Sequence, residues 1–197
     1  MTKRMLVLPA LALLVVAATA PADIKNTAHD FSTMSWSGGE VCKPCHTPHN
    51  AVSNDTNPDV NHILWNHEIT QATFTLFDGT STKLNTWSKL CLSCHDGTVA
   101  LDNFGGKTSG ANFIQGKYNV GTDLRDDHPV SVEYTEAWHT PKSALPREIR
   151  LFVDPDTNKD NIECSTCHAA HGVTGVPYLL RMDNAGSALC FACHATR

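Results

Sequence analysis

The amino-acid sequence predicts a mostly irregular, loop-rich fold with short helices and minimal β structure. All eight cysteines fall in four irregularly spaced Cys-x-x-Cys-His motifs, and the segments between these motifs are rich in turn-forming residues with little sustained helical period. The hydrophobic share of 41% is slightly low for a globular protein. The amino acids alone therefore do not account for the interior of the molecule.

The N-terminus has the pattern of a secretory signal peptide. Residues 1–4 are a short basic region, residues 5–17 are apolar, and an Ala-Pro-Ala cleavage site covers residues 20–22. A membrane anchor is the alternative, but the apolar run falls short of the roughly 20 residues that span a bilayer. We therefore predict a signal peptide at 1–22, a single domain at 23–197, secretion, and no membrane span in the mature chain.

The charge balance argues against nucleic acid as a partner. The formal net charge is −5, and removal of residues 1–22 takes away Lys3 and Arg4 but no acid, so the mature chain is more negative still. Binding to phosphates needs a basic surface instead.

The four motifs predict a multihaem c-type cytochrome. In Cys-x-x-Cys-His the two thiols form thioethers with haem vinyl groups, and the histidine becomes the proximal ligand of the iron. A structural zinc site or a redox dithiol does not require a histidine directly after every pair. The predicted attachment residues are the pairs Cys42 and Cys45, Cys91 and Cys94, Cys164 and Cys167, and Cys190 and Cys193, and the proximal ligands are His46, His95, His168 and His194. Four covalent haem c groups follow from these motifs.

Short helical turns are expected at the motifs, since positions i and i+3 of a helix lie on one face. A small hairpin is expected from residues 148–152 and 161–164, which flank a turn cluster at 154–159. The four haems would supply most of the apolar interior, so the chain is expected to wrap around them as one unit.

The remaining seven of the eleven histidines are candidates for the sixth coordination position of each iron. His49 and His171 each stand three residues after a proximal histidine and are expected to reach a neighbouring iron. His67 and His128 are held by bulky or rigid neighbours, and a ligand bond would tether His29 near the start of the mature chain. His62 and His139 are weaker candidates, as are Met34 and Met182, which would raise the potential of an iron.

Several strings resemble the tetrahaem extracellular cytochromes that polymerise into conductive filaments, the OmcE-like nanowire subunits. They are His-Asp-Phe-Ser at 29–32, Val-Cys-Lys-Pro-Cys-His-Thr-Pro-His-Asn-Ala at 41–51, Leu-Trp-Asn-His at 64–67, Leu-Cys-Leu-Ser-Cys-His-Asp-Gly-Thr-Val-Ala at 90–100, Asp-His-Pro-Val at 127–130 and Glu-Cys-Ser-Thr-Cys-His at 163–168. The resemblance implies stacked bis-histidine haems and subunits joined head to tail. It supports His29, His49, His67, His128 and His171 as distal candidates, which is five residues for four places.

The function expected from these observations is electron transfer without catalysis, in a secreted, extracellular or cell-surface filament whose partners are copies of the chain, redox proteins or extracellular electron acceptors. Two alternatives remain open at this point, a monomeric periplasmic shuttle and a multihaem reductase of the nitrite or hydroxylamine type. A reductase needs an iron with an open sixth position. For the filament we expect a distal histidine to cross the subunit boundary, with His29 best placed for this and His49 next.

Overall fold

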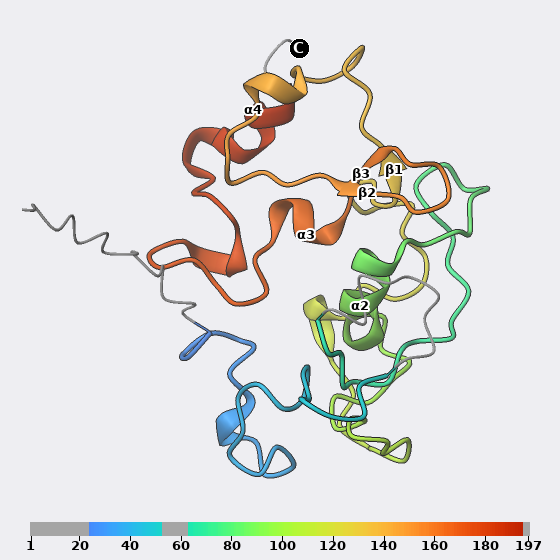
Figure 1. Ribbon diagram of the computed structural model, residues 1–197, viewed down its shortest axis with the longest axis vertical. Helices are drawn as coiled ribbons and strands as arrows, with labels where there is room; N and C mark the ends of the chain where they lie inside the picture. Colours follow the sequence, from blue (N-terminus) through green and yellow to red (C-terminus); the bar gives the residue numbers. More distant parts are fainter. Residues whose placement is uncertain (1–23, 53–62, 195–197) are drawn as a thin grey trace, which may run out of the picture.

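Loops and turns connect a few short helices and one small sheet in the computed structural model, which describes residues 24–52 and 63–194 (Figure 1). The helices are α2 (Thr86–His95), α3 (Cys164–Cys167) and α4 (Ala188–His194), and the strands are β1 (Val132–Glu133), β2 (Phe152–Val153) and β3 (Asp160–Ile162). Single 3-10 turns occur at η1 (Phe31–Thr33), η2 (Gly116–Tyr118), η3 (Lys142–Ala144), η4 (Pro177–Leu179) and η5 (Ala185–Ser187). This architecture confirms the prediction of an irregular fold with minimal β structure. The predicted signal peptide at 1–22 and His62 lie outside the described residues.

Helices form at three of the four motifs, because the second, third and fourth Cys-x-x-Cys pairs lie in α2, α3 and α4. At the first motif the expected short helix is reduced to a single helical turn. There the amide of His46 donates to the carbonyl of Cys42 at 2.8 Å, which closes one turn, and the amide of Thr47 donates instead to Leu64 at 2.9 Å. The contact with the distant segment at Leu64 and Trp65 accompanies this difference, since it draws the chain at His46 into an antiparallel bridge instead of a further helical turn.

The sheet has three antiparallel strands in the order β1-β3-β2. Phe152 pairs with Asn161 and Val153 with Asp160, which confirms a hairpin across the 154–159 turn, although its first strand begins only at Phe152. The sequence did not predict β1, in which Val132 pairs with Ile162 on the other edge of β3. The sheet leads directly into α3 and so fixes where the third motif starts.

The apolar core is small and lies on both sides of α2. Phe74, Leu76, Leu92 and Leu124 form one buried cluster, and Ile69 and Leu90 form another. The most deeply buried side chains elsewhere are polar, including Glu163, Thr70 and Ser88. So few buried apolar residues support the expectation that a large cofactor completes the interior.

A buried carboxylate joins the helices of the second and third motifs. Glu163 caps α3 and accepts hydrogen bonds from Asn85 Nδ2 at 3.0 Å, from Ser131 Oγ at 3.1 Å and from Ser88 Oγ in α2. Ser88 Oγ also accepts from the amide of Cys164 at 3.1 Å. These bonds fix the distance between the two attachment helices, which lie side by side.

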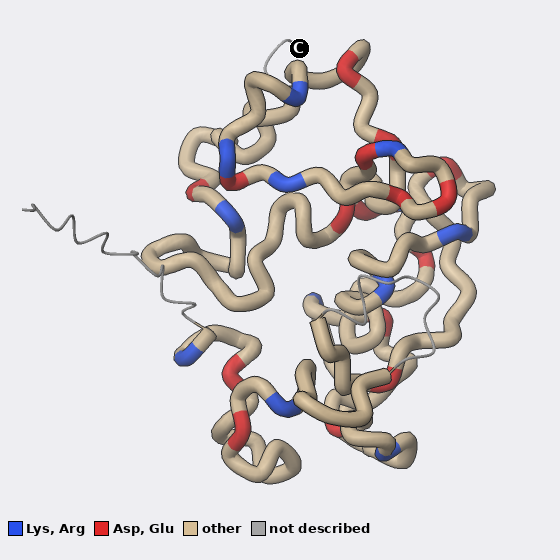
Figure 2. The backbone as a smooth tube through the Cα atoms, in the orientation of Figure 1, with Lys and Arg blue, Asp and Glu red and all other residues tan. Residues whose placement is uncertain are grey.

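Lysine and arginine residues are scattered along the chain without an extended basic face (Figure 2). This distribution agrees with the net negative charge of the chain. No helix in the described residues is long and apolar enough to cross a membrane.

Candidate functional site

Three of the four proximal histidines are oriented by backbone carbonyls. The Nδ1 atoms of His46, His95 and His168 lie 2.6 Å from the carbonyl of Ile63, 2.8 Å from that of Tyr118 and 3.2 Å from that of Tyr178, respectively. A carbonyl oxygen only accepts hydrogen bonds, so Nδ1 must carry the proton in each ring. The Nε2 lone pair is then the one that can bind a metal, which is the usual arrangement of a ligating histidine.

The segment that orients His168 is strained. Tyr178 and Leu179 adopt left-handed angles, with φ of 61° and 55°. Their carbonyls accept from His168 Nδ1 at 3.2 Å and from the amide of Ala169 at 2.7 Å, so this segment runs along the end of the third motif. Non-glycine residues persist in this conformation where the surroundings dictate it, as at binding sites.

Three histidine pairs have a geometry that suits one iron each. An imidazole nitrogen sits roughly 2 Å from a bound metal ion, and two rings on opposite sides of that ion are therefore separated by about 6 Å between their centres. The ring centres of His46 and His171 are 6.0 Å apart, those of His29 and His95 are 6.1 Å apart, and those of His128 and His194 are 6.5 Å apart. Each pair combines a proximal histidine with one of the predicted distal candidates.

The protonation of these rings also suits metal binding. Burial lowers the pKa values of His29, His168 and His171, and nearby histidines lower them further. Burial and two histidines lower the pKa of His194 as well. Metal binding needs the neutral imidazole, so these shifts favour the ligating form.

The fourth proximal histidine has no such partner. Within the described ranges, no histidine ring lies opposite His168, and the exposed ring of His49 faces no other ring. His67 is buried, at 2% exposure, and its Nδ1 and Nε2 atoms lie 2.8 Å and 3.1 Å from the carbonyls of Glu68 and Ala100. The structure thus brings His29, His128 and His171 to proximal histidines and leaves His49 and His67 apart from them. The ligand assignments themselves stay predictions.

His139 has a neighbour that the sequence did not indicate. Its ring centre is 5.1 Å from that of His194 and 4.9 Å from that of Tyr134, on which it stacks. The shorter separation places it beside His194, whereas His128 has the spacing of a ligand on the far side of an iron. No local motif marks His139, because the loop from β1 brings it there.

None of the eight cysteines forms a disulfide, and neighbouring cysteine side chains belong to consecutive motifs. Burial raises the pKa of Cys94, and Cys45 raises it further. A hydrogen bond with Cys164 raises the pKa of Cys91. Burial raises the pKa of Cys167 to about 11, with a further contribution from Cys193. The four motifs therefore follow one another in space in the order of the sequence.

A reactive Cys-x-x-Cys pair depends on a thiol of lowered pKa. Burial raises the pKa values of Cys45, Cys94, Cys167 and Cys193, so the first, second and fourth motifs lack this property. In the third motif a hydrogen bond with Cys91 lowers the pKa of Cys164, and there it is the adjacent His168 that distinguishes the motif from a redox pair. No three His, Cys, Asp or Glu side chains converge as a metal cluster in the part of the chain that the structure describes. A haem iron takes only two protein ligands, and that is the arrangement of the histidine pairs.

The surroundings of the motifs fit covalent haem. His128, His168, His171 and His194 are exposed as whole residues, even though the surrounding chain removes water from the rings of the last three and so lowers their pKa values. The large side chains of Tyr178 and Phe191 are also exposed, at 83% and 54%. Next to His46, the buried Nε1 atom of Trp65 has no hydrogen-bond partner among the described residues. A bound porphyrin would cover such apolar side chains, and its carboxylates would offer acceptors to an unpaired donor.

The comparison with known families addresses the C-terminal motifs. Residues 157–197 match the family model of the doubled CXXCH motif. The match includes the third and fourth motifs and indicates covalently bound c-type haem, as in multihaem cytochromes c, whose haems transfer electrons. No curated protein matches this chain.

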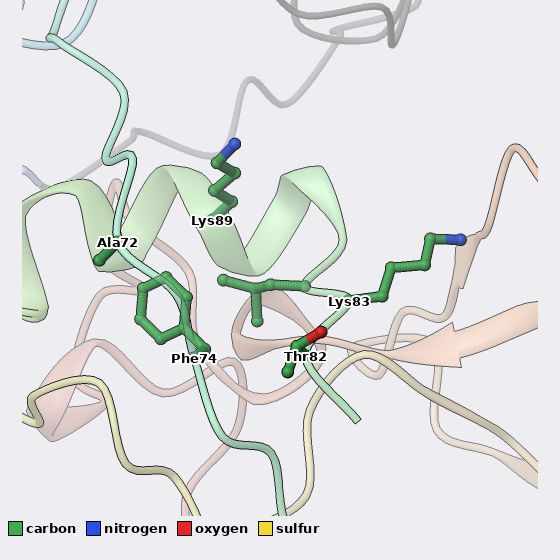
Figure 3. A pocket seen from close by; sticks show the side chains of 6 residues that line it. Ala72, Phe74, Thr82, Lys83 and Lys89 are labelled. Atoms are coloured by element: carbon green, nitrogen blue, oxygen red, sulfur yellow. The ribbon is translucent and has the colours of Figure 1, made fainter. Parts of the chain in front are cut away.

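A shallow hollow of about 250 Å³ lies away from this chemistry, between the segment 72–84 and α2 (Figure 3). It is lined by Ala72, Phe74, Thr82, Lys83, Leu84 and Lys89. None of these side chains is a cysteine or histidine, and the two lysine ammonium groups point outward. The hollow lies at the edge of the Phe74 cluster, so we assign it to packing.

Proposed function

We propose that the protein carries electrons through four haem c groups, one on each motif, with every iron held between two histidines and without catalysis. The observation that carries this proposal is the spacing of the pairs His46 and His171, His29 and His95, and His128 and His194, at 6.0, 6.1 and 6.5 Å. An iron with two strong nitrogen ligands has no open position for a substrate, whereas it can still gain and lose an electron. The chain's own part is to orient the rings, as the carbonyls of Ile63, Tyr118 and Tyr178 do for three proximal histidines.

The route of the electrons follows the order of the motifs. The thiol neighbours Cys45 and Cys94, Cys91 and Cys164, and Cys167 and Cys193 connect the first motif to the second, the second to the third, and the third to the fourth. The Glu163 network holds the second and third attachment helices together. Close and fixed spacing of neighbouring cofactors is what electron hopping requires.

We further propose that the subunits form a filament. Two histidines without a ring partner among the described residues, His168 and His49, support this proposal. His168 is oriented by Tyr178 but faces no histidine among the described residues, while His49 is exposed and faces no ring. The sequence favoured His29 as the ligand that crosses the subunit boundary. In the structure His29 lies against His95 of its own subunit, and its Nδ1 atom bonds to the carbonyl of Ala170 at 3.0 Å. We therefore assign the crossing role to His49, which would bind the iron at His168 of the next subunit. A contact of this kind repeats without closing, so it produces a filament.

The lack of a described histidine opposite His168 also defines the two alternative functions. If His168 alone holds its iron, that iron has an open position and the reductase becomes the better explanation. A monomeric shuttle would need a ligand from the same subunit, with His62, outside the described residues, as a candidate. The predicted signal peptide fits both locations, and the resemblance to extracellular filament subunits favours the cell exterior over the periplasm.

The test combines haem count and spin state in the secreted protein. The intact mass after acid-acetone treatment should correspond to four covalent haems on a chain that starts near Asp23. Electron paramagnetic resonance of the oxidised protein should show low-spin iron only, and negative-stain images should show filaments. Fewer covalent haems would refute the four-haem proposal, a persistent high-spin signal would favour the reductase, and particles of single-subunit size would favour the shuttle.

A further inference from the structure

Two of the four arginines in the described residues lack a carboxylate partner. Arg125 pairs with Asp123 at 2.5 Å and Arg147 with Glu148 at 3.0 Å. Neither Arg150 nor Arg181 has a carboxylate of the described residues within ion-pair distance. Acids outnumber bases in this chain, by 20 Asp and Glu to 15 Lys and Arg. Two arginines without an acid are therefore a specific feature rather than the result of a shortage of acids.

Arg181 is fixed at the third motif. Its Nε donates to the carbonyl of Ser165 at 2.5 Å, and its backbone amide donates to the carbonyl of Cys167 at 2.8 Å. The residue is half-buried. Because Nε is occupied, the two Nη groups remain as the fork that a guanidinium presents to planar anions.

The charge of Arg181 is uncompensated in this position. Burial lowers the pKa of Arg181, and the nearby Arg150 lowers it further. The only opposing effect comes from the thiol of Cys167, which becomes a neutral thioether when haem is attached. A partly buried cation beside a second cation is unfavourable unless an anion is bound there.

We infer that Arg181, with Arg150, forms a carboxylate-binding site for a propionate of a haem carried by a different motif. This inference rests on the proposed function, because haem is the source of the carboxylate. The vinyl groups that bind cysteine and the two propionates lie on opposite edges of a haem. Arg181 contacts Ser165 and Cys167, at the vinyl edge of the third haem, so it lies on the wrong side to reach the propionates of that haem. The site thus ties a second haem to the third motif.

The inference is tested on the four-haem holoprotein with Arg181→Gln. Removal of a positive charge next to a haem favours the oxidised form of that haem. We therefore expect the oxidised-to-reduced ratio of one haem to rise about tenfold, which corresponds to a midpoint potential about 59 mV lower. Redox-difference infrared spectra should show altered carboxylate bands. Arg181→Lys should reduce the shift in potential, since it keeps the charge. Arg147→Gln, the matched control in an exposed pair, should leave the potentials and the bands unchanged.

Several outcomes decide against the site. Identical potentials and carboxylate bands in Arg181→Gln and the parent, with four haems in each, would overturn the inference and leave the proposed function intact. If replacing phosphate by a zwitterionic buffer at constant ionic strength raises the same potential in the parent, the site holds a solvent anion and the inference is wrong. If Arg181→Gln fails to load haem, Arg150→Gln should lower the potential of one haem, and an unchanged set of potentials would overturn the inference. A parent without covalent haem would refute the proposed function instead.

Discussion

The ring of His171 lies 6.0 Å from that of His46, with an angle of 43° between the ring planes, so a histidine just after the third motif faces the proximal histidine of the first. Burial lowers the pKa of His171, and His46 lowers it further, which keeps the ring neutral. Nδ1 of His46 is engaged by Ile63, so its Nε2 is the atom that can bind iron. Residues far apart in the sequence thus have the spacing that the proposed shared iron requires.

Replacement of His171 by alanine should open one coordination position. We expect a high-spin signal from one iron in the electron paramagnetic resonance spectrum of the oxidised protein, with the covalent haem count unchanged, because the cysteines of the first motif are intact. His139→Ala is the control, since the position of His139 beside His194 is not that of a ligand, and it should stay low-spin. A fully low-spin spectrum of His171→Ala would contradict the proposed pairing.

Glu163 should be the most sensitive polar residue for stability. Glu163→Ala leaves Asn85, Ser88 and Ser131 without their acceptor in a buried site, and we expect a loss of about 3 kcal/mol in the free energy of unfolding. Thermal unfolding of the holoprotein measures this loss. Glu133→Ala, which removes an exposed partner of Lys159, should have little effect. Equal losses in the two variants would show that the buried network is not important for stability.

The same carboxyl predicts a pH dependence. Burial raises the pKa of Glu163 despite the hydrogen bonds from Ser88, Asn85 and Ser131 that lower it. A raised pKa means that the folded state binds the proton more tightly, so this contribution is full below the ordinary value of 4.5 and is lost as the pH rises through the folded pKa. Glu163→Gln cannot titrate, and the fall in stability over that range should be smaller than in the parent. An identical pH profile of the two proteins would contradict this assignment.

Tyr178 offers a test of stored backbone strain. Its φ of 61° costs a non-glycine residue about 1 kcal/mol, its side chain is 83% exposed, and its carbonyl accepts from His168. Tyr178→Gly relieves this strain, but the greater freedom of glycine in the unfolded chain offsets roughly 0.5–1 kcal/mol, so we expect almost no net change in the free energy of unfolding. Tyr118→Gly is the matched control, because Tyr118 orients His95 in the same way without a positive φ and should lose stability. Thermal unfolding distinguishes the two. A destabilised Tyr178→Gly would mean that the aromatic ring, not the strain, dominates at this position.

Sequence reasoning succeeded where local chemistry determines structure. The spacing of two thiols and an imidazole around one porphyrin is a local requirement, so the motifs, the loops between them and the short helices at α2, α3 and α4 could be predicted. The failures are non-local. At the first motif the chain bonds to the distant Leu64 instead of continuing a helix. The strand β1 and the position of His139 also depend on how the fold arranges segments that are far apart in the sequence. The unpaired state of Arg181 is invisible in the sequence, because the chain contains enough acids to pair it.

The filament proposal gives the last prediction, which concerns His49. In this proposal His49 binds the iron at His168 of the next subunit, so His49→Ala should remove both the sixth ligand of one iron and the link between subunits. We expect shorter filaments or single subunits in negative-stain images, together with one high-spin iron, while four covalent haems remain. His139→Ala serves as the control and should form filaments of parental length.

The two readouts must change together for this assignment to hold, because one bond is responsible for both. Shortened filaments with all irons low-spin would mean that His49 contributes to packing at the interface and that another residue binds the iron at His168. A high-spin iron in filaments of full length would place His49 on an iron of its own subunit. Filaments and spectra identical to the parent would exclude His49 from both roles, and the interface would then depend on contacts that cover the exposed Tyr178 and Phe191.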